Sequence, residues 1–237
     1  MIALTRVFDI SPTEWTAILL SLRVATVATL VATPLAVAVA WLLARREFWG
    51  KALLDAAIHL PLVLPPVVTG YLLLLTFGRR GIVGAWLAEH LGLVFAFRWT
   101  GAALACGIMS FPLLVRPIRL SIEAVDRRLE QAAATLGAAP WQVFLTVTLP
   151  LALSGVLAGM VLGFAKALGE FGATITFVSN IPGETQTISS AIYSLIQTPD
   201  GDTAALRLVV ISVLISTAAL VASEWFSRRA LQRLHGG

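Results

Sequence analysis

Long apolar stretches with few charges constrain this chain more than any other feature. A helix needs about 20 mostly apolar residues to cross a bilayer. Only 13% of the 237 residues are charged, about half of the share typical of soluble domains. The sequence therefore predicts an all-α polytopic membrane protein with five transmembrane helices. The expected spans are approximately 15–43, 53–77, 99–115, 149–168 and 206–226.

Other classes of protein are excluded by the same composition. The apolar share of 58% is too high for a disordered chain, and Cys106 is the only cysteine, so a disulfide scaffold is ruled out. The three histidines are scattered and have no metal-ligand spacing, so we expect no metal site. No catalytic motif was found either, and we expect no catalytic residue.

Lysine and arginine are distributed unevenly between the two sets of loops. Ten of the seventeen lie after the first span, after the third span and in the tail, whereas five lie on the other side. Cytoplasmic loops carry an excess of these residues, which predicts that the N-terminus is outside and the C-terminus is cytoplasmic. The basic balance therefore needs no nucleic-acid partner. Ser11-Pro12-Thr13-Glu14 has the pattern of a helix start, not of a cleavable leader.

Two segments between the spans are harder to assign. The segment 78–97 holds several charges, and we expect a short helix on the outer face. The segment 171–199 has one Glu but many hydroxyl, Gly and Pro residues before its end. It is either re-entrant or lies on the outer face, because irregular backbone at membrane depth must be buried or line a wet cavity.

The cytoplasmic segment 121–148 does not have the composition of a linker. Strong helix formers run from Glu130 to Leu136, Gly137 predicts a left-handed helix end, and Pro140 starts a second helix. Val143 and Phe144 begin an apolar face on that second helix. The hairpin either merely connects two spans or docks on a cytoplasmic partner.

The spacing within this hairpin resembles the EAA loop of binding-protein-dependent ABC importer permeases. Gln131 stands where an acid is usual, and Ala134 stands where a base is common, so the resemblance does not define a salt bridge to a partner. The residues that carry the resemblance, and that would couple the chain to an ATPase, are Glu130, Gln131, Ala132, Ala133, Gly137, Ala138, Phe144, Leu149 and Pro150.

Two further strings, at 60–70 and 167–185, are similar to the permease subunits of molybdate ABC transporters. The likeness covers 11–228, which we take as one type I ABC importer transmembrane domain. It implies a homodimer in the bacterial inner membrane, two cytoplasmic ATPase subunits and a periplasmic molybdate-binding protein. The chain lacks a P-loop of its own. We therefore expect ATP and Mg²⁺ on the partner ATPase and no cofactor on this chain.

Three alternatives stay open. The substrate could be tungstate, sulfate or thiosulfate instead of molybdate. An ion-coupled secondary transporter is disfavoured because paired broken helices in inverted repeats are not evident. An intramembrane enzyme is disfavoured because the sequence has no Gly-x-Ser-x-Gly and no His-Glu-x-x-His motif.

Residues that could line or gate a path lie in two strings. Prolines in the second span predict a kinked or unwound helix, and neutral donors after the fourth span suit an anion path. Glu170 repels an anion, so we expect it to pair with Lys166 four residues earlier. The candidates are Pro61, Pro65, Pro66, Gly169, Glu170, Thr174, Thr176, Ser179 and Asn180.

Three further features have structural interpretations. Gly155, Gly159 and Gly163 repeat every four residues, a spacing that permits close packing of helices. Arg23 lies in the first span and either reaches the membrane interface or attracts the anion. Trp15, Trp99 and Trp225 flank spans, as interfacial residues do.

Overall fold

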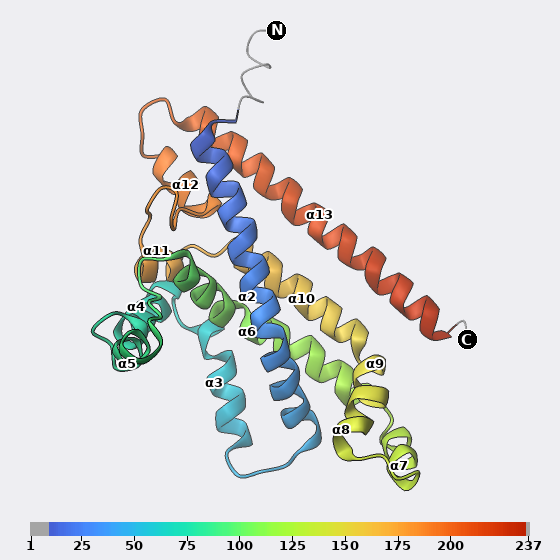
Figure 1. Ribbon diagram of the computed structural model, residues 1–237. Coiled ribbons are helices and arrows are strands. Elements are labelled where there is room, and N and C mark those ends of the chain that lie inside the picture. Colours follow the sequence, from blue (N-terminus) through green and yellow to red (C-terminus); the bar gives the residue numbers. More distant parts are fainter. Residues whose placement is uncertain (1–9, 236–237) are drawn as a thin grey trace.

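The computed structural model describes residues 10–235 (Figure 1). Side chains are described up to 219 and at 221, so Trp225 and the charged tail lie outside the described side chains. Within the described residues the regular structure is entirely helical. The elements are α2 (Pro12–Arg45), α3 (Lys51–Val63), α4 (Pro66–Phe77), α5 (Ile82–Leu91), α6 (Trp99–Ala124), α7 (Arg127–Thr135), α8 (Pro140–Val143), the π-helix η2 (Phe144–Thr148), α9 (Leu149–Leu151), α10 (Leu153–Leu168), α11 (Gly172–Val178), α12 (Ile188–Leu195) and α13 (Asp202–His235).

Three single helices are long and apolar enough to cross a membrane: α2, α6 and the described part of α13. Two bent pairs also qualify, and counting each pair as one span gives five. The first pair is α3 with α4, bent by 115°, and the second joins Pro140–Leu151 to α10 with a bend of 70°. The described helices are therefore compatible with the five expected spans if each bent pair crosses the membrane once.

The predicted break in the second span is confirmed. The stretch 53–77 forms two helices, and the chain leaves helical geometry between Val63 and Pro66. Pro65 has no backbone donor and forces the preceding residue into an extended conformation. Leu64 accordingly has φ −71° and ψ 144°.

The start of the first helix is also confirmed. The Ser11 hydroxyl accepts a hydrogen bond from the Glu14 backbone N–H at 3.2 Å, and the Ser11 N–H donates to the Glu14 carboxylate at 2.6 Å. Glu14 Oε1 also accepts two hydrogen bonds from the Arg207 guanidinium, at 3.0 and 2.8 Å. This ion pair joins the first turn of α2 to the second turn of α13 at one end of the molecule (Figure 1).

The centre of the molecule is formed by α2, α6 and α10. The glycine repeat on α10 faces α6: a Cβ at Gly155 would lie 2.6 Å from the Pro117 carbonyl oxygen, and one at Gly159 would lie 2.9 Å from that of Leu114. The predicted role of these glycines in packing is confirmed, and the packing is within the chain.

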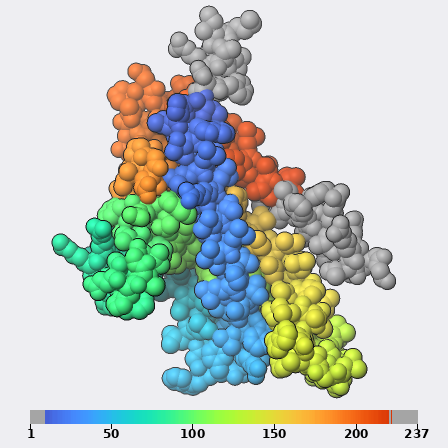
Figure 2. Space-filling model, in the orientation of Figure 1, coloured from blue at the N-terminus to red at the C-terminus, as the bar shows by residue number. Residues whose placement is uncertain are grey.

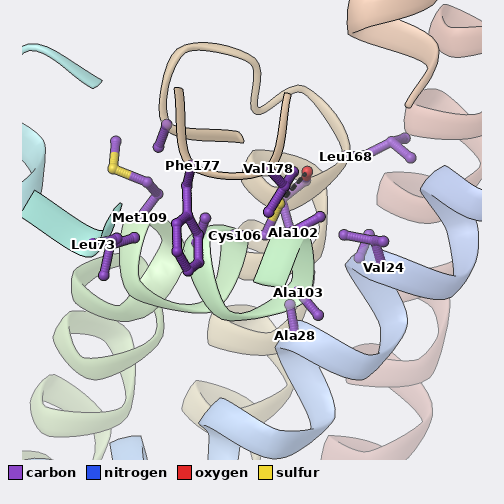
Figure 3. Packing of buried hydrophobic residues seen from close by; sticks show 14 of the residues in the cluster. Val24, Ala28, Leu73, Ala102, Ala103, Cys106, Met109, Leu168, Phe177 and Val178 are labelled. Carbon is purple, nitrogen blue, oxygen red and sulfur yellow. Dashed lines mark hydrogen bonds between the residues drawn. The ribbon is translucent and has the colours of Figure 1, made fainter. Parts of the chain in front are cut away.

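The segment 171–199 does not simply lie on the outer face. Its first helix, α11, packs on α4 and α6, and Phe177 and Val178 are completely buried. Figure 3 shows both side chains over Ala102 and Cys106 of α6. The second helix, α12, packs on α2 and α13. The expected short helix within 78–97 is present as α5.

The two ends of the molecule are well separated. The space-filling view places the hairpin of α7 and α8 at one end and α12 with the start of α2 at the other (Figure 2). Between them, α13 diverges from the centre (Figure 1). Only 11% of its apolar 18-residue stretch is buried.

Candidate coupling loop and transport path

The predicted hairpin forms between α6 and α10. Asp126 caps α7 by accepting a hydrogen bond from the Arg128 N–H at 2.9 Å. At the other end Gly137 has φ 90°, its N–H donates to the Ala134 carbonyl, and the next N–H donates to Ala133. This pair of bonds is the Schellman ending that glycine favours. The turn predicted at Gly137 is therefore confirmed.

Glu130 anchors the hairpin to the end of α2. Its Oε1 accepts hydrogen bonds from Arg45 Nη2 at 3.0 Å and from the Thr148 hydroxyl at 2.6 Å. Arg45 Nη2 also donates to the Val125 carbonyl at 3.0 Å. The Arg45 and Glu130 side chains are 9% and 19% exposed. This partly buried network connects α2, α7 and η2.

The apolar face of the second hairpin helix packs inward. Val143 is buried, and the Phe144 ring meets the Trp41 ring of α2 edge-to-face, with centroids 6.0 Å apart. Val143 and Phe144 therefore pack in part against the chain itself, and Phe144 remains half-buried.

Other apolar side chains are exposed at the tip of the hairpin. Leu136 is 89% exposed and Trp141 is 64% exposed, and they flank the Gly137 turn. We call these two residues the hairpin tip. The sequence analysis did not select them, although their position beside the turn is a signal that could have found them.

The remaining residues of the motif differ in exposure and position. Ala132 and Gln131 are exposed, whereas Ala133 and Ala138 are half-buried. Gln131 also lines a pocket of about 330 Å³ between the hairpin and α2. Leu149 and Pro150 form α9, just before the 70° bend into α10.

The two strings of path candidates meet where α4 crosses α11. A Cβ added at Gly172 would lie 2.7 Å from the Pro66 Cβ, and one at Gly70 would lie 2.5 Å from the Ala173 carbonyl oxygen and 2.9 Å from the Thr176 Cβ. Gly70 thus allows two helices to approach closely. Pro65 lies next to this crossing as the residue before α4. Pro61, inside α3, instead lines an apolar groove between α2, α3 and α6.

The charged pair behaves as expected. Lys166 Nζ donates to Glu170 Oε2 at 2.6 Å, and the Ala173 N–H donates to Glu170 Oε1 at 3.0 Å. Glu170 is only 2% exposed. Its charge is therefore neutralised within the chain, just past Gly169 at the end of α10.

The neutral polar side chains after α10 mostly form hydrogen bonds to nearby residues of the chain. The Thr174 and Thr176 hydroxyls donate to the carbonyls of Phe171, the residue before α11, and of Gly172, its first residue. The Ser179 carbonyl accepts from the Thr185 hydroxyl at 3.3 Å. Asn180 Nδ2 donates to the Ser194 hydroxyl at 2.6 Å, while its Oδ1 is buried without a partner. Most of these donors satisfy turns and helix ends.

This arrangement of helices is similar to that of solved bacterial ABC importers. A solved bacterial ABC transporter involved in the import of the acidic polysaccharide alginate matches with a TM-score of 0.75. The match covers 97% of this chain and 83% of that one. The two chains are 18% identical, so the likeness concerns the fold.

The family is defined by the sequence. Residues 32–232 match the binding-protein-dependent transport system inner membrane component, and the chain belongs to this family of multi-pass membrane proteins. The molybdenum transport system permease protein ModB of Escherichia coli K12 is 59% identical over 220 residues, covering 93% of this chain and 96% of that protein. The ModB protein of Haemophilus influenzae is 58% identical, covering 94% and 98%.

Proposed function

We propose that this chain is the permease subunit of an importer that moves molybdate across the bacterial inner membrane. The observation that carries the proposal is the 59% identity to a molybdenum transport permease across nearly the whole of both chains. The path candidates are compatible with an anion that must pass without being trapped, because Glu170 is neutralised by Lys166. The energy comes from ATP hydrolysed, with Mg²⁺, on separate subunits.

The working unit is a homodimer with two cytoplasmic ATPase subunits and a periplasmic molybdate-binding protein. Each hairpin tip docks on one ATPase, because two large apolar side chains at a polar end of the molecule need a surface that excludes water. The Glu130–Arg45 network supports this role, since it ties the hairpin to a membrane-spanning helix. Movement of the ATPase is thereby transmitted to α2.

Transport is tested in proteoliposomes that contain the permease, its ATPase and its binding protein. We expect ATP-dependent uptake of radioactive molybdate. Competition by excess tungstate or sulfate shows which other oxyanions the transporter accepts. Uptake driven by an ion gradient without ATP contradicts the proposal and favours a secondary transporter. Uptake of sulfate but not of molybdate would show that the chain belongs to a sulfate importer.

Docking is tested with Leu136→Asp and Trp141→Ala. We expect both variants to lose co-purification with the ATPase subunit. The matched control is Ile196→Asp, because Ile196 is 57% exposed and follows α12 at the opposite end of the molecule. Retention of the ATPase by both tip variants contradicts this assignment of the docking surface.

A further inference from the structure

Arg23 is a charged residue whose place in the fold is not explained by the transport path. It is exposed on α2, and its guanidinium carbon lies 3.7 Å from the centroid of the Trp99 ring. Among the described residues, no carboxylate lies within ion-pair distance of it. An arginine in a membrane-spanning helix needs a partner or contact with the interface.

The position of Arg23 along α2 corresponds to one edge of the bilayer. The helix between Arg23 and Arg45 is about 33 Å long at 1.5 Å per residue, close to the ~30 Å thickness of the hydrocarbon core. Trp99, on which Arg23 stacks, is the first residue of α6, and tryptophan favours the interface. Arg23 therefore lies at headgroup level, on the side opposite the hairpin.

An apolar groove begins one helical turn from this arginine, at Val27 and at the Trp99 ring on which Arg23 stacks. It has a volume of about 630 Å³, lies between α2, α3 and α6, and includes Trp99 in its lining. On α2 it is lined by Val27, Val31 and Leu35, one residue per turn. On α6 it extends from Trp99 to Phe111, about 18 Å along the helix. That length is slightly more than the ~15 Å depth of one leaflet.

We propose that this groove binds one phospholipid, with an acyl chain along the groove and the phosphate on the Arg23 guanidinium. Thr100 is the only lining residue with a polar side-chain oxygen or charge, so the groove suits a hydrocarbon chain and not an oxyanion. An unneutralised guanidinium at headgroup level complements a phosphate, with which it forms charge-assisted hydrogen bonds. The lipid also covers α3, which has Ile58 as its only buried residue.

The experiment is native mass spectrometry of the complete transport complex after delipidation and addition of phosphatidylglycerol. Diacylglycerol with the same acyl chains serves as the probe that lacks a phosphate. We expect the complex to retain one phosphatidylglycerol per permease chain and to retain diacylglycerol at least tenfold more weakly, a difference of about 1.4 kcal/mol. Arg23→Gln removes this preference, whereas Arg80→Gln, an exposed arginine outside the groove, keeps it.

Filling the groove tests the acyl-chain site. A Cβ at Gly107 would meet only the Ala28 carbonyl oxygen, at 3.7 Å, so Gly107→Leu can extend into the groove without a clash at its Cβ. We expect it to abolish lipid retention. Val31→Trp is a second variant, because Val31 lines the groove and is 71% exposed. Val213→Leu, at an exposed position on α13, is the control.

Two results overturn the proposal. One is equal retention of the two lipids by the wild-type complex. The other is that both groove-filling variants retain phosphatidylglycerol normally but dissociate the permease dimer, which would show that a second copy of the chain occupies the groove.

Discussion

Gly137 shows how one residue controls the shape of the coupling hairpin. Its φ of 90° is strained for any residue with a Cβ, at a cost of about 1–2 kcal/mol. A Cβ at this position has no atom within 4 Å, so the cost comes from the backbone alone. We expect Gly137→Leu to displace the tip and to reduce stimulation of the ATPase by loaded binding protein in the reconstituted complex.

The control for this prediction is Gly92→Leu. Gly92 also has a positive φ, 67°, and open space around its Cβ, but it ends α5, outside the hairpin. It experiences the same kind of backbone strain without touching the coupling element. If Gly137→Leu leaves both stimulation and molybdate uptake unchanged, the role given to the turn is wrong.

Glu130 is a second residue with a predicted effect. Glu130→Gln removes the charge that faces Arg45 in a partly buried network, and hydrogen bonds to charged groups contribute about 1.5–3 kcal/mol. We expect a lower midpoint of thermal unfolding in detergent. Glu47→Gln is the control because Glu47 pairs with Lys51 but is 89% exposed, and such surface pairs contribute little. Equal midpoints for the two variants contradict the anchoring role.

At the scale of elements, the interface between α10 and α6 depends on glycines of α10, which have no side chain to hold the two helices apart. A Cβ at Gly155 would lie 2.4 Å from the Ser121 Cβ and 2.6 Å from the Pro117 carbonyl oxygen. Gly155→Ala therefore forces the helices apart, and we expect a large loss of folded protein and of thermal stability. Both are measured by size-exclusion chromatography and thermal scanning in detergent.

The control lies at the end of the same helix. A Cβ at Gly169 would meet only the Ala165 carbonyl oxygen, at 3.7 Å, and Gly169 has a negative φ. Gly169→Ala should therefore be tolerated. A Gly155→Ala protein as stable as this control would mean that the close contact between the helices is unnecessary.

The sequence predicted local breaks in the helices better than it predicted which helices are buried, and the difference has a physical reason. Pro65 and Pro66 revealed the break between α3 and α4, because proline acts locally on the backbone, whereas Pro61 lies inside α3. The sequence left the burial of α11 open, because it allowed either a re-entrant segment or one on the outer face, and only the packing of α11 on α4 and α6 shows that it is buried. The contact between Phe144 and Trp41 could not be read from the sequence, because the two residues lie far apart in the chain.

At the scale of the whole molecule, the uneven distribution of lysine and arginine predicts which end is cytoplasmic. The hairpin and the segment before α12 lie at opposite ends (Figure 2). We introduce single cysteines by Glu184→Cys and Gln131→Cys, both at exposed positions, after Cys106→Ala. In intact cells a membrane-impermeant maleimide should label only the cysteine at position 184.

Permeabilised cells provide the comparison for this experiment. Labelling at position 131 should appear only after the inner membrane is opened, and the Cys106→Ala background should remain unlabelled. The reverse pattern, with position 131 labelled in intact cells, would invert the predicted orientation and move the hairpin away from the ATPase.

The sequence by itself determined the membrane class, the number of apolar stretches, the breaks at proline and the turn at Gly137. These features depend on hydropathy and on local backbone preferences, which operate over a few neighbouring residues. The tertiary structure alone decided that Glu130 pairs with Arg45, that Leu136 and Trp141 form the exposed tip, and that Arg23 stacks on Trp99, a residue that lines an apolar groove. Such relations join residues far apart in the chain, and only packing determines which side chains become neighbours.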